Sequence, residues 1–302
     1  MRRWTSERES WTDTPPLPKA SPFLGGKDSI GFVLAEGIGK IKTDNSRLDA
    51  EVLLAHAMGV PRSWLLAHPE TEVTPKERER FSNAVERVAA GDPLPYVLGH
   101  WEFFKLDFKV DPRVLIPRPE TELLVETALT WVKQQHAPRI ADIGTGSGCI
   151  AIALAVNNSV IEITATDTSE DALNVARDNA IEHTVSARIQ FKRTDLMLTI
   201  GPVNLICCNP PYVTTAELDD LPAALHEPCL ALDGGVDGLE PIRKLIAAAP
   251  QKLTPGGVLL MEIGADQREA VLEIARGSFS TARGIRVLQD LAGLDRLLVV
   301  QS

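Results

Sequence analysis

The chain has 302 residues, of which 44% are apolar and 24% charged, and its net charge is −10 with a pI near 5.2. This length and apolar content suffice for one large or two modest folded domains. The acidic balance argues against a non-specific nucleic-acid or anionic-membrane surface, and no apolar stretch reaches membrane-spanning length. The four cysteines lack metal-ligand spacing, which predicts no metal site and fits a reducing compartment; they are Cys149, Cys207, Cys208 and Cys229.

Residues 1–29 combine four prolines with Ser, Thr and charged residues and show little apolar periodicity. We predict a disordered extension, because such a segment cannot bury enough apolar surface to fold. Its arginines suggest an organelle transit peptide, but Glu7, Glu9 and Asp13 argue against one, since transit peptides are poor in acidic residues. The default expectation is the bacterial cytoplasm.

Residues 30–90 have helical periodicity. Ser46 and Asp49 have the spacing of a capping box, and Thr74-Pro75 predicts the start of a second helix with proline at its first position. Gly91-Asp92-Pro93 ends this helix. The segment therefore predicts a small helical bundle, and its residues alone do not decide between a recognition domain and a stabilising appendage.

Apolar and polar residues alternate between 104 and 110, which predicts a two-strand connector within residues 101–116. Pro119-Glu120-Thr121 then begins an amphipathic helix. Seven further apolar runs read as strands, namely residues 140–143, 161–165, 189–192, 203–208, 258–262, 285–288 and 296–300. Helical stretches separate most of them, so we expect an α/β fold with a doubly wound, mostly parallel sheet.

A glycine-rich turn follows the first strand of this sheet. Its residues, after Asp142, are Gly144-Thr145-Gly146-Ser147-Gly148, and a helical stretch follows from Cys149. Glycines at this spacing permit a tight turn and let a ligand approach the backbone at a helix N-terminus. Asp167, at the end of the second strand, suits the two hydroxyls of a ribose. The spacing differs from the dinucleotide pattern G-x-G-x-x-G and favours S-adenosylmethionine over NAD, whereas the plainer alternative is a turn that merely links strand to helix.

The tetrapeptide Asn209-Pro210-Pro211-Tyr212 comes directly after the apolar run 203–208, where ligands of open α/β sheets bind. Two consecutive prolines fix the backbone and remove two donors, so the carbonyls of Asn209 and Pro210 have no strand to join. With the Asn209 side-chain oxygen they can accept hydrogen bonds from an NH2 group, while Tyr212 stacks on the plane that carries it. A proline-terminated strand with a turn is the alternative.

With these motifs the chain resembles the class I, S-adenosylmethionine-dependent methyltransferases, and within them the HemK/PrmC family of peptide chain release factor glutamine N5-methyltransferases. The match covers roughly residues 30–300. Further stretches that carry the resemblance are Gly91 to Gly99, Val114 to Glu122, Leu232 to Gly235 with Asp237 to Leu239, Met261 to Gly264, and Asp290 to Gly293 with Asp295-Arg296.

The resemblance implies methyl transfer from S-adenosylmethionine to the side-chain N5 of the glutamine in the Gly-Gly-Gln motif of release factors. It assigns residues 30–92 to release-factor recognition, 93–117 to a β-hairpin connector and 118–302 to a methyltransferase domain with an antiparallel edge hairpin. It also places Asp195 and Leu196 near the adenine, although an acidic residue after a strand is also an ordinary helix cap. Asn209 is expected beside the cofactor as well as the substrate. We expect a monomer without membrane or direct nucleic-acid binding.

Two other substrates fit the same loop chemistry. Exocyclic amines of nucleic-acid bases present a similar planar NH2 group, but the chain is acidic and has no obvious basic stripe. A sister family methylates a glutamine of a ribosomal protein, but its members depart from the Ile116-Pro117-Arg118-Pro119-Glu120-Thr121-Glu122 pattern that this chain keeps. A cofactor-binding adaptor without activity does not account for the intact acceptor loop.

Overall fold

The computed structural model describes residues 26–195 and 200–302. The chain divides after Gly91 into two compact units, which we describe separately. The predicted disorder of residues 1–29 falls almost wholly outside the described residues, and so does Leu196. No helix in the described ranges is long and apolar enough to cross a membrane.

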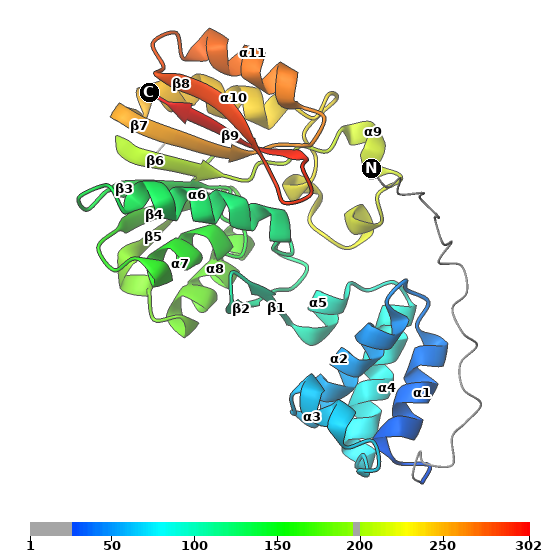
Figure 1. Cartoon of the computed structure of the whole chain (residues 1–302). Coiled ribbons are helices and arrows are strands. Elements are labelled where there is room, and N and C mark those ends of the chain that lie inside the picture. Colours follow the sequence, from blue (N-terminus) through cyan, green and yellow to red (C-terminus); the bar gives the residue numbers. More distant parts are fainter. Residues whose placement is uncertain (1–25, 196–199) are drawn as a thin grey trace, which may run out of the picture. The chain divides into compact units, whose positions relative to one another are not determined.

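The first unit is a bundle of helices, and Figure 1 shows them in blue to cyan. Its helices are α1 (Ile30–Lys40), α2 (Ser46–Met58), α3 (Arg62–Ala67) and α4 (Pro75–Ala89). They bury a common apolar core that includes Leu53, Leu54, Leu65, Phe81 and Val85. Helices of 6–15 residues are marginal alone in water, so this shared core provides most of their stability.

Among the residues that the structure describes, side-chain hydrogen bonds cap the starts of α1 and α4 but not those of α2 and α3. Thr74 and Glu77 form the two reciprocal bonds of a capping box at α4, with proline at the first helical position as predicted. The capping box predicted at Ser46 is wrong. Ser46 is itself the first residue of α2, and Asp49 accepts a hydrogen bond from Thr43 in the preceding loop instead.

The second unit is built on a seven-stranded sheet in the order β5-β4-β3-β6-β7-β9-β8. Its strands are β3 (Arg139–Ile143), β4 (Glu162–Asp167), β5 (Ile189–Arg193), β6 (Val203–Cys208), β7 (Leu253–Glu262), β8 (Gly284–Gln289) and β9 (Asp295–Gln301). The first five pair in parallel, whereas β9 runs antiparallel to both β7 and β8. The predicted doubly wound sheet with an antiparallel edge hairpin is confirmed.

Helices cover both faces of this sheet (Figure 1). One face packs against α6 (Glu122–Val132), α7 (Cys149–Asn157) and α8 (Glu170–Glu182), and the other against α10 (Glu240–Ala248) and α11 (Arg268–Ser278). An apolar core lies on each face, the first core under α6, α7 and α8 and the second under α10 and α11. Successive residues of a strand point to opposite faces, so Ile140 packs in the first core, whereas Ala141 and Ile143 pack in the second. Strands buried on both faces explain the nearly continuous apolar runs of the sequence.

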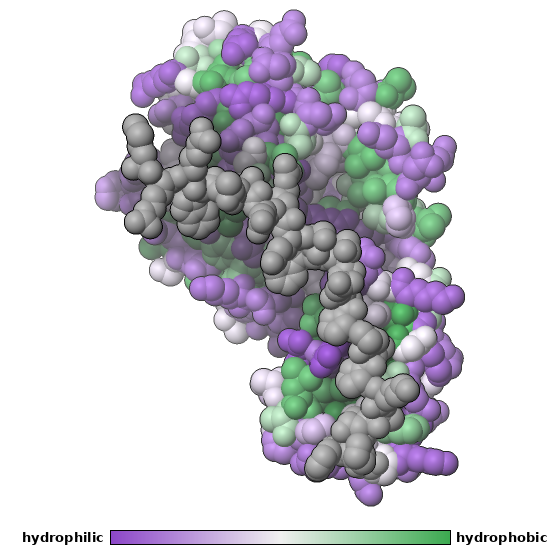
Figure 2. Space-filling model, turned by 45° about the vertical axis from the view of Figure 1, so that its right-hand side comes forward, coloured by the Kyte–Doolittle hydropathy of each residue, from purple (hydrophilic) through white to green (hydrophobic). Residues whose placement is uncertain are grey.

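Shorter elements complete the second unit. They are α5 (Leu94–Leu98), the 3-10 turns η1 (Pro119–Thr121), η2 (Ser186–Arg188), η3 (Pro222–Leu225), η4 (Cys229–Ala231) and η5 (Ala249–Gln251), and α9 (Thr215–Leu218). The predicted helix start at Pro119 is thus a 3-10 turn that leads into α6. Hydrophilic residues predominate on the face shown in Figure 2, where apolar residues form separate patches.

A two-stranded hairpin precedes the large sheet. It pairs β1 (His100–Phe103) with β2 (Leu106–Lys109) in antiparallel register, beginning one residue before the segment 101–116 predicted to hold two strands. Phe104 lies in the turn with φ 52°, and its backbone N–H donates to Glu122 Oε1 of α6 at 2.8 Å. Phe103 and Phe108 enter the first core, so the hairpin packs as part of the sheet unit.

Candidate active site

The predicted site motifs meet at one edge of the sheet. Strands β5, β4, β3, β6 and β7 are consecutive neighbours and run in parallel, so their carboxyl ends lie side by side. The glycine turn follows β3, Asp167 ends β4, and Asn209 follows β6. The fold therefore brings together groups that are separated by more than 60 residues of sequence, at the edge where open α/β sheets bind ligands.

The glycine turn is left-handed at each of its three glycines, with φ of 70° at Gly144, 54° at Gly146 and 83° at Gly148. A Cβ on Gly144 or Gly146 would meet nothing within 4 Å, whereas one on Gly148 would lie 2.9 Å from Ile152 Cδ1 and 3.1 Å from Ala176 Cβ. Gly148 is thus required for packing of α7. Gly144 and Gly146 present bare backbone to open space, as a cradle for a ligand requires.

Asp142 anchors this turn from inside the protein. It is fully buried, and its Oδ2 accepts hydrogen bonds from Thr145 Oγ1 at 2.6 Å and from the Ala151 backbone N–H at 3.2 Å. Burial raises the pKa of Asp142 to about 7, against the lowering effect of these two bonds. Its Oδ1 has no hydrogen-bond partner among the described residues. The predicted ligands Thr145 and Ser147 are buried as well.

Asp167 joins the end of β4 to the glycine turn. Its Oδ2 accepts from the Gly146 N–H at 3.0 Å and its Oδ1 from the Ser169 N–H at 2.9 Å. Burial raises the pKa of Asp167, although these backbone donors oppose the shift. The carboxylate is half-buried and retains lone pairs that can accept from ribose hydroxyls. Ribose binding by Asp167 stays a prediction. Asp195 is exposed two residues beyond β5, and Leu196 lies outside the described residues.

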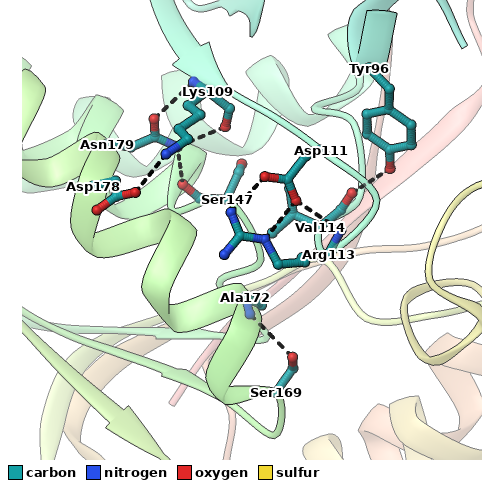
Figure 3. Close-up of polar contacts among 10 residues, drawn as sticks. All are labelled: Tyr96, Lys109, Asp111, Arg113, Val114, Ser147, Ser169, Ala172, Asp178 and Asn179. Carbon is teal, nitrogen blue, oxygen red and sulfur yellow. Dashed lines mark hydrogen bonds and ion pairs between the residues drawn. The ribbon is translucent and has the colours of Figure 1, made fainter. Parts of the chain in front are cut away.

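A buried asparagine that the sequence did not single out braces the glycine turn. Asn179 of α8 donates to the carbonyls of Ser147 at 2.9 Å and Lys109 at 3.1 Å, and its Oδ1 accepts from the Lys109 N–H at 2.8 Å (Figure 3). Lys109 also forms an ion pair with Asp178 in the same view. One amide thereby connects the hairpin, α8 and the turn.

Asn209 is held by a chain of hydrogen bonds from two other segments. Its Nδ2 donates to Thr121 Oγ1 at 3.1 Å, and Thr121 Oγ1 donates to Glu262 Oε2 at 2.6 Å. Thr121 is 2% exposed and Glu262 1%. The register of β6 with β7 pairs Cys208 with Met261 and so places Asn209 beside Glu262. Within the described residues, Asn209 Oδ1 and the Pro210 carbonyl accept no hydrogen bond; Asn209 is half-buried and Pro210 buried.

Tyr212 completes the loop and contacts the same carboxylate. Its hydroxyl donates to Glu262 Oε1 at 3.3 Å, and burial together with Glu262 raises the pKa of Tyr212 to about 12. The phenol therefore stays a donor at neutral pH. The Tyr212 carbonyl accepts from Gln267 Nε2 at 3.1 Å. A Cβ on Gly238 would lie 2.5 Å from that carbonyl oxygen, so glycine is required where this segment crosses the loop.

The sequence singled out the loop but not its supports. From the sequence, Thr121 reads as part of a helix start, and Glu262 stands only in one of the stretches that carry the family resemblance. A signal for Glu262 was present, because an acidic residue ends the apolar run 258–262 at the same sheet edge. No metal-binding cluster of His, Cys, Asp or Glu occurs in residues 26–195 and 200–302.

Comparison with known proteins fits this architecture. Family models match at residues 36–99, the PrmC N-terminal domain, and at residues 119–226, the methyltransferase small domain. The release factor glutamine methyltransferase of Moorella thermoacetica is 46% identical over 84% of this chain and 90% of its own length, and that of Chlorobaculum tepidum is 41% identical over 84% and 90%.

Among solved structures, the hMettl16 catalytic domain in complex with a 3′UTR hairpin has a TM-score of 0.52 and 16% identity, and covers 74% of this chain and 81% of that one. This likeness shows the shared fold alone. The identity to the bacterial enzymes, over most of both chains, decides the family. The chain belongs to the release factor glutamine methyltransferase family.

Proposed function

We propose that this enzyme transfers a methyl group from S-adenosylmethionine to the side-chain amide nitrogen of the glutamine in the Gly-Gly-Gln motif of release factors. Family membership supports the reaction and the substrate class. The observation that carries the chemistry is the orientation of Asn209, whose nitrogen is bound to Thr121 and whose oxygen is left for a substrate. A primary amide offers the two N–H donors that such an acceptor site requires.

When bound, S-adenosylmethionine supplies an electrophilic methyl carbon on a positively charged sulfur: as the N–C bond forms the C–S bond breaks, S-adenosylhomocysteine leaves with the electron pair, and the methylated amide nitrogen releases one proton to water. The glycine turn suits this cofactor, because Gly144 and Gly146 leave open space at their backbone. We assign the backbone of residues 144–148 and the carboxylates of Asp142 and Asp167 to its binding, with Asp195, Leu196 and Asn209 as further contacts. Asp142 is fully buried and acts from behind the turn, through its hydrogen bonds to Thr145 and to the Ala151 N–H.

The acceptor nitrogen is the difficult partner, since an amide lone pair is delocalised into its carbonyl. Asn209 Oδ1 and the Pro210 carbonyl bind its two hydrogens and stabilise the positive charge that develops as the nitrogen attacks. Pro211 keeps the loop rigid, and the Tyr212 ring packs against the amide plane. Holding the nitrogen in line at near-attack distance lowers the barrier by up to roughly 7–11 kcal/mol.

The remaining assignments rest on family resemblance. We propose that the helical unit recognises the release factor, that the hairpin segment 93–117 links it to the catalytic residues 118–302, and that the enzyme acts in the bacterial cytoplasm. The net charge of −10 supports a protein partner over nucleic acid. A monomeric state stays a prediction.

The test is transfer of labelled methyl from S-adenosylmethionine to a purified release factor. The same factor with its Gly-Gly-Gln glutamine replaced, a ribosomal protein mixture, DNA and ribosomal RNA serve as parallel acceptors. We expect label on the intact factor alone. Label on nucleic acid or on a ribosomal protein, with none on the factor, would contradict the proposed substrate. The assignment of residues 209–212 to binding of an NH2 group would still hold.

A further inference from the structure

The two supports of the acceptor loop have a defined hydrogen-bond polarity. In its ionised form Glu262 only accepts, so the single proton of the Thr121 hydroxyl is then committed to Glu262 Oε2 at 2.6 Å. The Thr121 oxygen can then act only as an acceptor toward Asn209. Of the two ends of the Asn209 amide, only Nδ2 fits there, and it lies at 3.1 Å. The opposite end, Oδ1, must face away from Thr121.

The second oxygen of the same carboxylate accepts the Tyr212 hydroxyl at 3.3 Å. Glu262 thus contacts both the group that orients Asn209 and the aromatic ring of the loop. Thr121 and Glu262 are each at least 98% buried, and they come from η1 and the end of β7, which are remote in sequence from residues 209–212. An arrangement of this kind is rigid, because each buried polar atom in it has a partner.

We propose that Thr121 and Glu262 are positioning residues, which act through Asn209 and Tyr212 to hold the amide oxygen and the ring toward the acceptor glutamine. The proposal rests on the proposed function and deepens it. Neither residue touches the substrate in this arrangement. They disfavour the conformation in which the Asn209 amide is flipped by 180°. In that conformation Asn209 would present N–H groups to the N–H groups of the glutamine amide, and no hydrogen bond could form.

The charge state of Glu262 determines which groups donate and which accept in the hydrogen bonds that run from Glu262 through Thr121 to Asn209. A protonated carboxyl can donate to Thr121, whose hydroxyl is then free to donate to Asn209 Oδ1 and so favours the reversed amide. Burial has the largest effect and favours the neutral form of Glu262, as does Glu120 of η1, whereas the hydrogen bonds from Thr121 and Tyr212 and the charge of Arg296 of β9 favour the charged form. Glu262→Gln, which can always donate, imitates the neutral form.

Three variants of the full-length enzyme test this inference: Thr121→Val, Thr121→Ser and Glu262→Gln. We measure kcat and KM for the release factor, and the Kd for S-adenosylmethionine. Thr121→Val and Glu262→Gln should each lower kcat by roughly tenfold or more, with the cofactor Kd within about twofold of wild type. Thr121→Ser keeps the hydroxyl and should retain kcat within about twofold. A fourth protein that combines Thr121→Val with Glu262→Gln should lose little more kcat than the worse single variant, because Glu262 orients Asn209 through Thr121.

A second readout does not need the substrate. The side-chain amide of Asn209, assigned in nitrogen-15 NMR spectra by its loss in Asn209→Ala, should keep its position in Thr121→Ser and shift in Thr121→Val and Glu262→Gln. Unchanged kcat and unchanged amide signals in Thr121→Val would overturn the proposal, and so would an equal loss of cofactor binding and kcat. If the wild type labels no release factor, the proposed function fails, while the amide signals still decide the positioning roles.

Discussion

At the scale of single residues, Asn209 has the most direct part in the proposed reaction, because its oxygen and the Pro210 carbonyl form the acceptor pair. Asn209→Ala removes one of the two acceptors that bind the developing charge. We expect kcat to fall by roughly 10²–10³. The Kd for S-adenosylmethionine should stay nearly unchanged, as isothermal titration can show. Equal losses in kcat and in cofactor affinity would contradict the assignment, and the exposed Asn174→Ala is the matched control.

The three glycines of the turn have different roles, and alanine substitution separates them. Gly148→Ala brings a Cβ to 2.9 Å from Ile152 at φ 83°, so it should lower the melting temperature strongly. Gly146→Ala meets open space and carries only the cost of a positive φ, about 1–2 kcal/mol. It places a methyl group where the cofactor is expected to approach the backbone, so cofactor affinity should fall more than stability does.

Thermal unfolding and cofactor titration of both variants check this difference. A Gly146→Ala protein that binds S-adenosylmethionine as tightly as the wild type would place the cofactor away from the turn. A Gly148→Ala protein of unchanged melting temperature would show instead that α7 and α8 can separate at little cost.

Residue identities that carry their own chemistry could be predicted from the sequence, whereas supporting residues could not. The glycines, Asp167 and residues 209–212 stand in recognisable patterns at strand ends. Thr121 lies 88 residues before Asn209, and their contact depends on how η1 meets the carboxyl ends of β6 and β7. Such contacts follow from register and packing, which local patterns do not encode.

At the scale of elements, the β1–β2 hairpin and α8 depend on one buried amide. Asn179→Ala leaves the N–H and carbonyl of Lys109 and the carbonyl of Ser147 without this partner. A buried group left unsatisfied costs about 1–3 kcal/mol; the Ser147 carbonyl is such a group, whereas the two Lys109 groups are only partly buried and regain water, so we expect the free energy of unfolding to fall by roughly 2–5 kcal/mol. The cofactor Kd should rise as well, since Ser147 belongs to the glycine turn.

Urea unfolding and cofactor titration of Asn179→Ala and Asn174→Ala provide the comparison. Both residues lie on α8, but Asn174 is exposed and bonds only to Arg177. Equal stability of the two variants would show that water replaces the Asn179 amide at no cost, and that the hairpin is held by Phe103 and Phe108 alone.

Most elements were predictable from apolar runs and helix signals, and the exceptions have local causes. The strand predicted at 161–165 runs to Asp167, because its last residues pair with β5. In the described part of the chain no capping box forms at Ser46, because Asn45 is the N-cap residue of α2 and the Asp49 side chain accepts a hydrogen bond from the Thr43 hydroxyl instead. At Pro119 the motif predicted helix, but the chain forms a 3-10 turn first, and this turn presents Thr121 to Glu262.

At the scale of the whole molecule, the order of strands was the least accessible property. Alternating strands and helices predict a parallel sheet, but they do not fix which strands are neighbours. The antiparallel position of β9 between β7 and β8 entered through family resemblance. That order matters for function, because β6 and β7 must be adjacent for Glu262 to lie beside Asn209.

Burial of Glu262 links the stability of residues 92–302 to pH. Burial raises its pKa from 4.5 to about 7, so between these values the folded protein binds a proton that the unfolded chain releases. The resulting stabilisation is complete below about pH 4.5 and is lost as the pH rises through 7, at about 1.4 kcal/mol per pH unit at most. Glu262→Gln does not titrate. Its free energy of unfolding relative to wild type should therefore rise by about 3 kcal/mol across this window.

Urea unfolding of both proteins from pH 4.5 to 8, followed by circular dichroism, measures this difference. Asp142 and the other titrating groups are common to both proteins and cancel in the comparison, and so does any loss of hydrogen bonding that does not vary with pH. Parallel stability curves would show that Glu262 ionises in the fold as it does in water. A diverging pair, with Glu262→Gln the more stable at high pH and the slower in methyl transfer, would show that the enzyme keeps a destabilising buried carboxylate because its charge orients Asn209.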